Sequence, residues 1–348
     1  MTSARTNNRL GYLDGWRGLA ILSVLIGHFL NLPIILFGRL GVELFFALSG
    51  RLMAEILFEK QFPLGKFISR RFSRIFPALL AFVIVLMIAT RLTIWPVESQ
   101  PVAVSTAASV LTFTYGYLRD VVVLPQHILE HTWSLAVEEH AYFILAFVAF
   151  LGRKHIARPA VFILIIALAS IIDGSLRTYA FHQDYYQAYW VTDSKLSSIF
   201  LPAFIYLHRD TLISWLGRGA PIAAIIAGGI GVLLFYHNVP TVVTYTLAPL
   251  MFGISMACLP VAHEWLIAVL ENRVVRQIGL MSYSIYLWQQ PFMALGEQKG
   301  LLVRLALLVP VLGCAAISYY GVERPARRWL NARIGGRSER SRRLVEVG

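Results

Sequence analysis

The residues best able to do chemistry in this sequence are charged side chains set inside long apolar stretches. Arg17 and His28 lie in the first such stretch, and Glu43 lies in the second. An ionisable side chain at mid-membrane costs roughly 2.5–3.5 kcal/mol on insertion scales, so each one calls for a reason. A histidine that faces a carboxylate in a dry cavity can act as a general base. A hydrogen bond that only joins two helices is the alternative interpretation.

The depth of these groups follows from helix geometry. Arg17 and His28 are eleven residues apart, which is about 16 Å along a helix, so they occupy opposite halves of a membrane. The second apolar stretch runs back, and it brings Glu43 to about the depth of His28. Further along it, Arg51 and Glu55 are four residues apart and are expected to neutralise each other.

The segment HTWSLAVEEH forms a second polar group, at the start of a later apolar stretch. Thr132 or Ser134 is expected to cap the helix, with Glu138 about one turn further in. Glu139 is expected to point elsewhere and to be interfacial. Capping and surface exposure explain most such glutamate pairs, so this segment alone is a weak signal of catalysis.

The third group is basic and stands in KFISRRFSRIFP. A helix would present Arg70, Arg71 and Arg74 together, because they are three or four residues apart. Arginines bind phosphate oxygens in a bidentate manner, so this group could hold a phosphorylated cofactor. Lipid headgroups and the usual excess of positive charge on the cytoplasmic side are the alternative explanation.

The elements that carry these groups must be membrane helices. Of 348 residues, 57% are hydrophobic and only 14% are charged, whereas a soluble domain carries about 25% charged residues. This composition excludes a disulfide scaffold, a disordered chain and an ordinary cytosolic enzyme. Cys258 and Cys314 lie in apolar runs, and no histidine has the spacing of a metal ligand, so no metal is expected.

The apolar runs predict an all-α bundle of about ten membrane-spanning helices. Each needs roughly 20 mostly apolar residues. The predicted spans are 12–30, 41–58, 75–95, 132–151, 159–175, 191–208, 220–237, 240–260, 279–296 and 300–321. A shorter run, 102–117, could be an eleventh span or a re-entrant or surface segment.

Charge decides which of these alternatives is preferred. With ten spans and both termini in the cytoplasm, 22 of the 31 Lys and Arg residues lie inside and three lie outside. Residues 1–328 are expected to form the membrane domain, and 329–348 a basic, disordered cytoplasmic tail. The first apolar run lacks a cleavage site and is expected to remain as a helix. Four other ionisable residues near span ends are expected to snorkel, namely Arg91, Asp173, Lys195 and Arg304.

The order of motifs resembles one known family, the acyltransferase family 3 membrane proteins. The motifs are YLDGWRGLAILSVLIGH, GVELFFALSG, RRFSRIFP, HTWSLAVEE, SYSIYLW and VERPARR, and they run from about residue 11 to 328. Each motif alone is modest, but six in order are a strong match. Members of this family are bacterial multi-pass enzymes that acylate surface polysaccharides and related acceptors.

The resemblance implies an acyl-CoA-dependent O-acyltransferase in the bacterial inner membrane. It would move an acyl group, most simply acetyl, from cytoplasmic acyl-CoA to a hydroxyl of a carbohydrate on the outer face. The resemblance assigns catalysis to His28, Glu43 and Glu138, and acyl-CoA binding to Arg17, Arg70, Arg71 and Arg74. Substrate binding is expected at Trp133, Tyr283, Tyr286 and Trp288, and an oxyanion donor at Tyr283, Trp133 or Ser49.

The hypothesis for the reaction is that His28, oriented by Glu43 or Glu138, deprotonates a sugar hydroxyl that attacks the thioester. A covalent acyl-histidine route stays open beside direct transfer. Several positions depart from the family pattern. Glu43 stands where Asp is more common, Arg51 stands where an apolar aromatic is common, His140 and Ala141 replace a common Gln-Phe, and Gln289 replaces a frequent His. These departures leave the acceptor and the acyl chain open.

Two other functions are compatible with buried charges in such a chain. One is a transporter of a small solute or an acyl group, and the other is a membrane sensor or scaffold without turnover. The expected partners are a carbohydrate or glycan acceptor and membrane lipid, with no nucleic acid, and assembly as a homo-oligomer stays open. The six motifs favour the enzyme.

Overall fold

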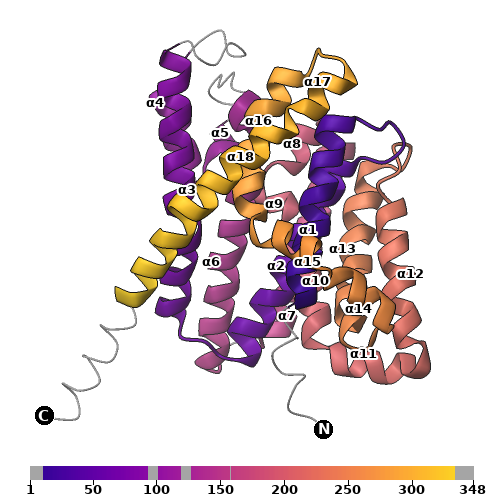
Figure 1. Ribbon diagram of the computed structural model, residues 1–348. Coiled ribbons are helices and arrows are strands. Elements are labelled where there is room, and N and C mark those ends of the chain that lie inside the picture. Colours follow the sequence, from indigo (N-terminus) through magenta and orange to yellow (C-terminus); the bar gives the residue numbers. More distant parts are fainter. Residues whose placement is uncertain (1–10, 93–100, 119–126, 157, 334–348) are drawn as a thin grey trace, which may run out of the picture.

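The computed structural model describes residues 11–92, 101–118, 127–156 and 158–333. These residues form a bundle of helices joined by turns (Figure 1), and apart from one isolated bridge between Ile35 and Tyr236 no strand occurs among them. The predicted all-α fold class is therefore confirmed for this part of the chain.

The longer helices make up the body of the bundle. They are α1 (Gly11–Leu25), α2 (Phe37–Ala54), α3 (Leu64–Arg91), α6 (Trp133–Arg153), α7 (Pro159–Tyr179), α10 (Ser197–Leu207), α12 (Ala220–Leu233), α13 (Thr241–Cys258), α16 (Ser282–Gly296) and α18 (Leu308–Ser318).

Shorter helices lie between these or continue them. They are α4 (Val104–Leu111), α5 (Tyr115–Leu118), η4 (His127–Thr132), α8 (Tyr185–Tyr189), α9 (Thr192–Lys195), α11 (Arg209–Leu216), η5 (Gly217–Gly219), η6 (Leu259–Val261), α14 (Glu264–Leu270), α15 (Arg273–Leu280) and α17 (Leu301–Ala306). Three are π-helical turns: η2 (Ile26–Leu30), η3 (Glu55–Glu59) and η7 (Tyr319–Glu323).

Seven helical stretches in the described part of the chain are long and apolar enough to cross a membrane. They are Gly11–Leu30, Leu64–Arg91, Ile128–Arg153, Pro159–Tyr179, Arg209–Leu233, Thr241–Val261 and Leu301–Arg333. Large apolar side chains on these helices face outward, such as Phe147 (60% exposed) and Ile317 (74% exposed). Lipid is the environment that covers such surfaces, so the chain is a multi-pass membrane protein.

Three of the ten predicted spans are not among these seven. The range 41–58 falls on α2, which carries Arg39, Glu43 and Arg51 within 18 residues. The other two, 191–208 and 279–296, are centred on α10 and α16, which have 11 and 15 residues. Ten crossings and cytoplasmic termini therefore stay predictions.

The run 102–117 does not form a span. It folds into α4 and α5, which have eight and four residues. Eight residues of helix extend about 12 Å, well short of a hydrocarbon core of about 30 Å. At its start, the Val102 amide donates to the Thr90 hydroxyl at 3.1 Å, which ties the segment to the end of α3.

The predicted basic tail, 329–348, is described only in part. Its first residues, up to Arg333, are helical, and 334–348 lie outside the described residues.

Close helix contacts fix the direction in which α1 presents its polar residues. A Cβ on Gly15 of α1 would lie 1.8 Å from the carbonyl oxygen of Leu270, and a Cβ on Gly41 of α2 would lie 2.5 Å from that of Ala20. Only glycine permits these backbones to come so close. Helix α1 is therefore held against both α14 and α2, and its rotation is set.

The end of the first span changes from α-helix to the π-helical turn η2. The turn ends at Asn31, whose φ of 50° is left-handed and stops the helix. Single π-helical turns change the direction of the side chains that follow them and are frequent at functional sites. His28 lies within this turn.

Candidate active site

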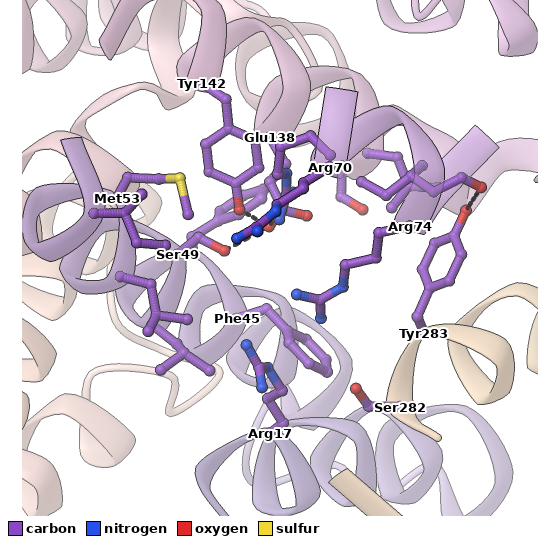
Figure 2. A pocket seen from close by; sticks show the side chains of 18 of the residues that line it. Arg17, Phe45, Ser49, Met53, Arg70, Arg74, Glu138, Tyr142, Ser282 and Tyr283 are labelled. Atoms are coloured by element: carbon purple, nitrogen blue, oxygen red, sulfur yellow. Dashed lines mark hydrogen bonds and ion pairs between the residues drawn. The ribbon is translucent and has the colours of Figure 1, made fainter. Parts of the chain in front are cut away.

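The basic residues of the predicted cofactor site surround one cavity of about 510 Å³. It lies among α1, α2, α3, α6 and α16, and Figure 2 shows its lining side chains. We call it the basic cavity. Its cations are Arg17, Lys60, Arg70, Arg71 and Arg74. Among the residues that the structure describes, Glu138 is the one carboxylate that lines it. Such an excess of positive charge favours an anionic ligand.

These arginines differ in how far their charge is already paired. Arg17 is held by Asp14 at 2.8 Å, and Arg71 by Glu139 at 3.1 Å. Within the described ranges, neither Arg70 nor Arg74 forms an ion pair with a carboxylate. Figure 2 shows the Arg74 side chain extending into the cavity above Arg17. Arg70 and Arg74 therefore have charge available for a ligand.

Glu138 is the centre of a hydrogen-bond network at the wall of the basic cavity. One of its oxygens accepts hydrogen bonds from Ser49 (2.5 Å) and from the hydroxyl of Tyr142, and lies 3.6 Å from the Arg71 guanidinium. Glu138 and Tyr142, which are four residues apart on α6, therefore share one face of that helix. Arg71 also lies over the Tyr142 ring, 3.8 Å from its centroid. The Arg71 side chain is therefore held by Glu138, Glu139 and the ring of Tyr142.

A second cavity, of about 350 Å³, contains His28. We call it the histidine cavity. Its polar lining includes Arg39, Glu130 and His131, and its aromatic lining includes Trp133 and Trp190. The two tryptophan rings are stacked, with centroids 5.5 Å apart and planes 8° apart.

The two cavities are neighbours. Val42 and Tyr286 line both of them. The Tyr286 hydroxyl bonds to Ser134 (2.7 Å) and donates to the backbone carbonyl of His131 (2.9 Å). Tyr286 is therefore held firmly at the boundary between the basic cavity and the histidine cavity.

His28 does not contact either of the carboxylates expected to orient it. Its Nδ1 lies 2.5 Å from the Oε1 of Gln289, which is fully buried on α16. On the other side of the ring, a Cβ on Gly38 would lie 3.2 Å from Nε2. Glu138 lines the basic cavity instead, where its oxygen is bound by Ser49. The expected pairing of His28 with Glu43 or Glu138 is therefore not found.

Glu43 is buried elsewhere and has a different partner. Its carboxylate accepts a hydrogen bond from Lys195 at 2.8 Å, and these side chains are 0% and 1% exposed. The Lys195 ammonium also lies 3.2 Å from the centroid of the Tyr245 ring. Neither cavity is lined by Glu43. The expectation that Lys195 snorkels was wrong, because a buried ion pair and an aromatic ring replace water around its charge.

The four predicted substrate residues are not all brought together. Trp133 lines the histidine cavity, and Tyr286 lies at the boundary. Tyr283 lines the basic cavity, with its hydroxyl bonded to the Ile75 carbonyl at 2.8 Å. Trp288 lines neither cavity and packs edge-on against Phe82.

Two local expectations at the start of α6 differ from the structure. Neither Thr132 nor Ser134 caps the helix, because their hydroxyls donate to the carbonyls of Leu129 and His131. Glu139 is 7% exposed rather than interfacial, since Arg71 turns toward it. The expected pair of Arg51 and Glu55 is confirmed at 3.4 Å.

Sequence reasoning missed Gln289, Lys195 and Trp190 as parts of this region. Gln289 was noted only as a departure from the family pattern, and glutamine carries no charge that marks it inside an apolar run. Lys195 did carry that mark, but its place near a span end favoured snorkelling. The signal that could have identified Lys195 is that a carboxylate inside an apolar run, such as Glu43, needs a cationic partner.

Comparison with known proteins gives the family. The family model for the acyltransferase domain of acyltransferase family 3 matches residues 10–320. The chain therefore belongs to this family of membrane acyltransferases, which confirms the resemblance carried by the six motifs.

The individual relatives share only 27–28% sequence identity with this chain. The "Putative membrane-bound transacylase BcsY" of Komagataeibacter xylinus is 27% identical, over 94% of this chain and 87% of the relative. The "Peptidoglycan O-acetyltransferase OatA" of Listeria monocytogenes is also 27% identical, over 81% of this chain and 49% of the relative. The "Putative O-acetyltransferase SACOL0978" of Staphylococcus aureus is 28% identical, over 79% and 49%. The chain thus spans about half the length of the last two proteins, and no solved structure matches it.

Proposed function

We propose that this protein is a membrane O-acyltransferase that takes its acyl group, most simply acetyl, from acyl-CoA and transfers it to a carbohydrate hydroxyl. The observation that carries the proposal is the pair of adjoining cavities. One is lined by five cations and the other contains His28, and they share Val42 and Tyr286. The relatives OatA and SACOL0978, whose names both include "O-acetyltransferase", support the same reaction class.

Acyl-CoA is the donor that fits the basic cavity. Its phosphates would bind to Arg70 and Arg74, whose charges have no carboxylate partner in the described ranges. Its thioester would then reach the boundary at Tyr286. The apolar wall of the cavity, with Val42, Phe45 and Leu52, suits the uncharged arm that joins the phosphates to the thioester.

The acceptor would occupy the histidine cavity. Stacked aromatic rings such as Trp133 and Trp190 offer flat apolar faces to sugar rings, while His28 offers a nitrogen to a hydroxyl. A carbohydrate acceptor agrees with the name of the relative OatA, which acts on peptidoglycan.

In this reaction His28 first accepts a proton and later gives it back. His28 accepts the proton of the acceptor hydroxyl, and the hydroxyl oxygen forms a bond to the thioester carbonyl carbon. The carbon–sulfur bond breaks, and His28 returns the proton to the departing thiolate, so that an ester and free CoA are formed. General base assistance of this kind contributes about 10²–10⁴ in rate. Glu138 would hold Arg71 in place beside the donor, and Glu43 would position α2.

Membrane sidedness follows from charge. Lys60, Arg70, Arg71 and Arg74 line the basic cavity, so we propose that this cavity opens to the cytoplasmic side of a bacterial inner membrane. Acyl-CoA is made in that compartment. The histidine cavity would then serve an acceptor on the opposite side.

Release of free thiol from acetyl-CoA by the purified protein in detergent tests this function. The assay compares wild type, His28→Ala and the control His263→Ala, in the presence of oligosaccharides of different composition. His263 is exposed and lines neither cavity, so its variant is expected to match wild type. We expect His28→Ala to lose at least about 10²-fold in turnover while its thermal shift with CoA is kept.

Two outcomes would contradict the proposal. Undiminished turnover in His28→Ala removes His28 from the reaction, and a wild-type protein that shows no thermal shift with CoA removes the donor. For the acceptor, mass analysis of surface glycans should reveal O-acyl groups that disappear when the gene is deleted and return with the wild-type gene.

A further inference from the structure

Among the residues that the structure describes, the hydrogen-bond partner of the His28 ring is the side-chain amide of Gln289. The Nδ1 of His28 and the Oε1 of Gln289 are 2.5 Å apart, although 261 residues separate them in the chain. An amide oxygen can only accept a hydrogen bond, so the contact requires the proton of the neutral imidazole to be on Nδ1. The Nε2 of His28 is then the nitrogen with a free lone pair.

The amide itself is held in the matching orientation. Gln289 is 0% exposed, and its Nε2 donates toward the Oε1 of Gln290 at 3.5 Å. With the amide nitrogen directed at Gln290, the amide oxygen faces His28. The two hydrogen bonds are thus consistent in direction: His28 Nδ1 donates to the oxygen of Gln289, and the nitrogen of Gln289 donates to the oxygen of Gln290.

The opposite edge of the imidazole is kept open by a glycine. Gly38 lines the histidine cavity beside His28, and a Cβ there would lie 3.2 Å from Nε2 and from Cδ2. The nitrogen with the lone pair therefore faces the part of the cavity where the π-helical turn η2 meets α2.

We propose that Gln289 is the positioning residue that holds His28 in its Nδ1-protonated form, with Nε2 directed at the acceptor. This inference rests on the proposed function and deepens it. A neutral amide orients the imidazole without adding negative charge, in contrast to the histidine–carboxylate pair expected from the sequence. The Glu43 carboxylate, which the sequence suggested as a partner of His28, is paired with Lys195 instead.

Other titratable groups share the cavity with His28. They are Arg39 of α2, Glu130 and His131 of η4, the tyrosines Tyr185 and Tyr186 of α8, Tyr286 of α16, and Glu297 directly after it. None of them forms a hydrogen bond with the His28 ring in the described part of the chain, so the hydrogen bond that orients this ring is the one with Gln289.

The test uses three variants of the full-length protein in detergent: Gln289→Met, Gln289→Glu and the control Gln277→Met. Methionine has a similar length but offers no amide acceptor, so we expect kcat to fall about 10²-fold while KM for acetyl-CoA is unchanged. Glutamate restores an acceptor, so we expect kcat to recover and the acidic limb of its pH–rate profile to move to higher pH. Gln277 is exposed and bonds to Tyr320, so Gln277→Met should match wild type.

A merely structural role for Gln289 predicts a different pattern. In that case both Gln289 variants lose thermal stability together, KM and kcat change alike, and the pH–rate profile of Gln289→Glu keeps its shape. That result would overturn the proposal.

A second measurement does not depend on turnover. Two-bond proton–nitrogen NMR spectra of protein labelled with ¹⁵N-histidine distinguish the two neutral forms of imidazole. We expect one signal set of the Nδ1-protonated form to vanish in His28→Ala and to change in Gln289→Met. If His28 of the wild-type protein is protonated on Nε2, the inference is refuted, whether or not the protein turns over acetyl-CoA. If His28 is protonated on Nδ1 but the protein is inactive with acetyl-CoA, only the proposed function is refuted.

Discussion

The ammonium of Lys195 lies 2.8 Å from the carboxylate of Glu43, and both side chains are closed off from solvent. This pair connects α2, which also carries Gly38 and Val42 to the histidine cavity, with the short helix α9. The charge of Glu43 thus serves the placement of a helix that lines the candidate site. A charged residue inside a membrane protein can contribute to function at a distance by fixing the backbone that carries the reactive groups.

Breaking this pair should destabilise the protein. In Lys195→Met, the Glu43 carboxylate loses its partner while it stays buried, which costs about 3–5 kcal/mol. We expect a large drop in the midpoint of thermal unfolding in detergent, and the double variant Lys195→Met with Glu43→Leu should recover part of it. Lys299→Met is the control, because Lys299 is exposed. A single variant as stable as this control would contradict the structural role of the pair.

Arg74 should contribute to donor affinity. It extends into the basic cavity and has no carboxylate partner in the described ranges. A hydrogen bond to a charged group is worth about 1.5–3 kcal/mol, so Arg74→Gln should weaken CoA binding roughly 10- to 100-fold. Isothermal titration of CoA measures this, with Arg218→Gln as a control at an exposed position. Equal affinity in the two variants would argue that the phosphates bind elsewhere.

Gly38 should be sensitive to the smallest substitution. The Cβ of Gly38→Ala would lie 3.2 Å from Nε2 of His28, so the ring must move by a few tenths of an ångström. We expect kcat to fall about tenfold, because small displacements of a reacting group are costly. The matched control is Gly229→Ala, a helical position where nothing lies within 4 Å of the added Cβ. Full activity in Gly38→Ala would show that Nε2 does not need this space.

The sidedness of the membrane can be measured at the two ends of α7. Ala180 and His155 are exposed and lie beyond its opposite ends, next to Tyr179 and close to Arg153 respectively. The basic residues beside His155 should stay in the cytoplasm. On intact cells, a membrane-impermeant maleimide should therefore label Ala180→Cys and spare His155→Cys.

The labelling experiment needs two controls. The native cysteines Cys258 and Cys314 are unpaired and should be replaced by alanine first. Permeabilised cells should then be labelled at both introduced positions. The reverse pattern on intact cells would invert the proposed orientation and place the basic cavity outside.

Much of the class of this protein was readable from its sequence. The low content of charged residues predicted a membrane bundle, because only lipid can cover so much apolar surface. The same scarcity marked Arg17, His28, Glu43 and Glu138, since ions inside apolar runs are costly and therefore rare. The structure confirms the all-α bundle, and it places three of these four on the linings of the two cavities.

Span boundaries were less predictable. The run 102–117 had the composition of a membrane segment, but its helix α4 ends at Leu111 after eight residues. Helix α2 covers most of the predicted span 41–58 and lies within the bundle (Figure 1), but it is not among the seven stretches that are long and apolar enough to cross a membrane. Hydropathy measures what faces lipid, and neither segment is surrounded by lipid on all sides.

The sequence by itself determined the family, the fold class and the residues able to do chemistry. Only the tertiary structure decided which of them meet: His28 with Gln289, Glu43 with Lys195, and Glu138 with Ser49. These partners come from helices separated by 89 to 261 residues in the chain. A buried polar group must find a partner wherever the packing of helices provides one, and spacing along one chain does not encode which helices are neighbours.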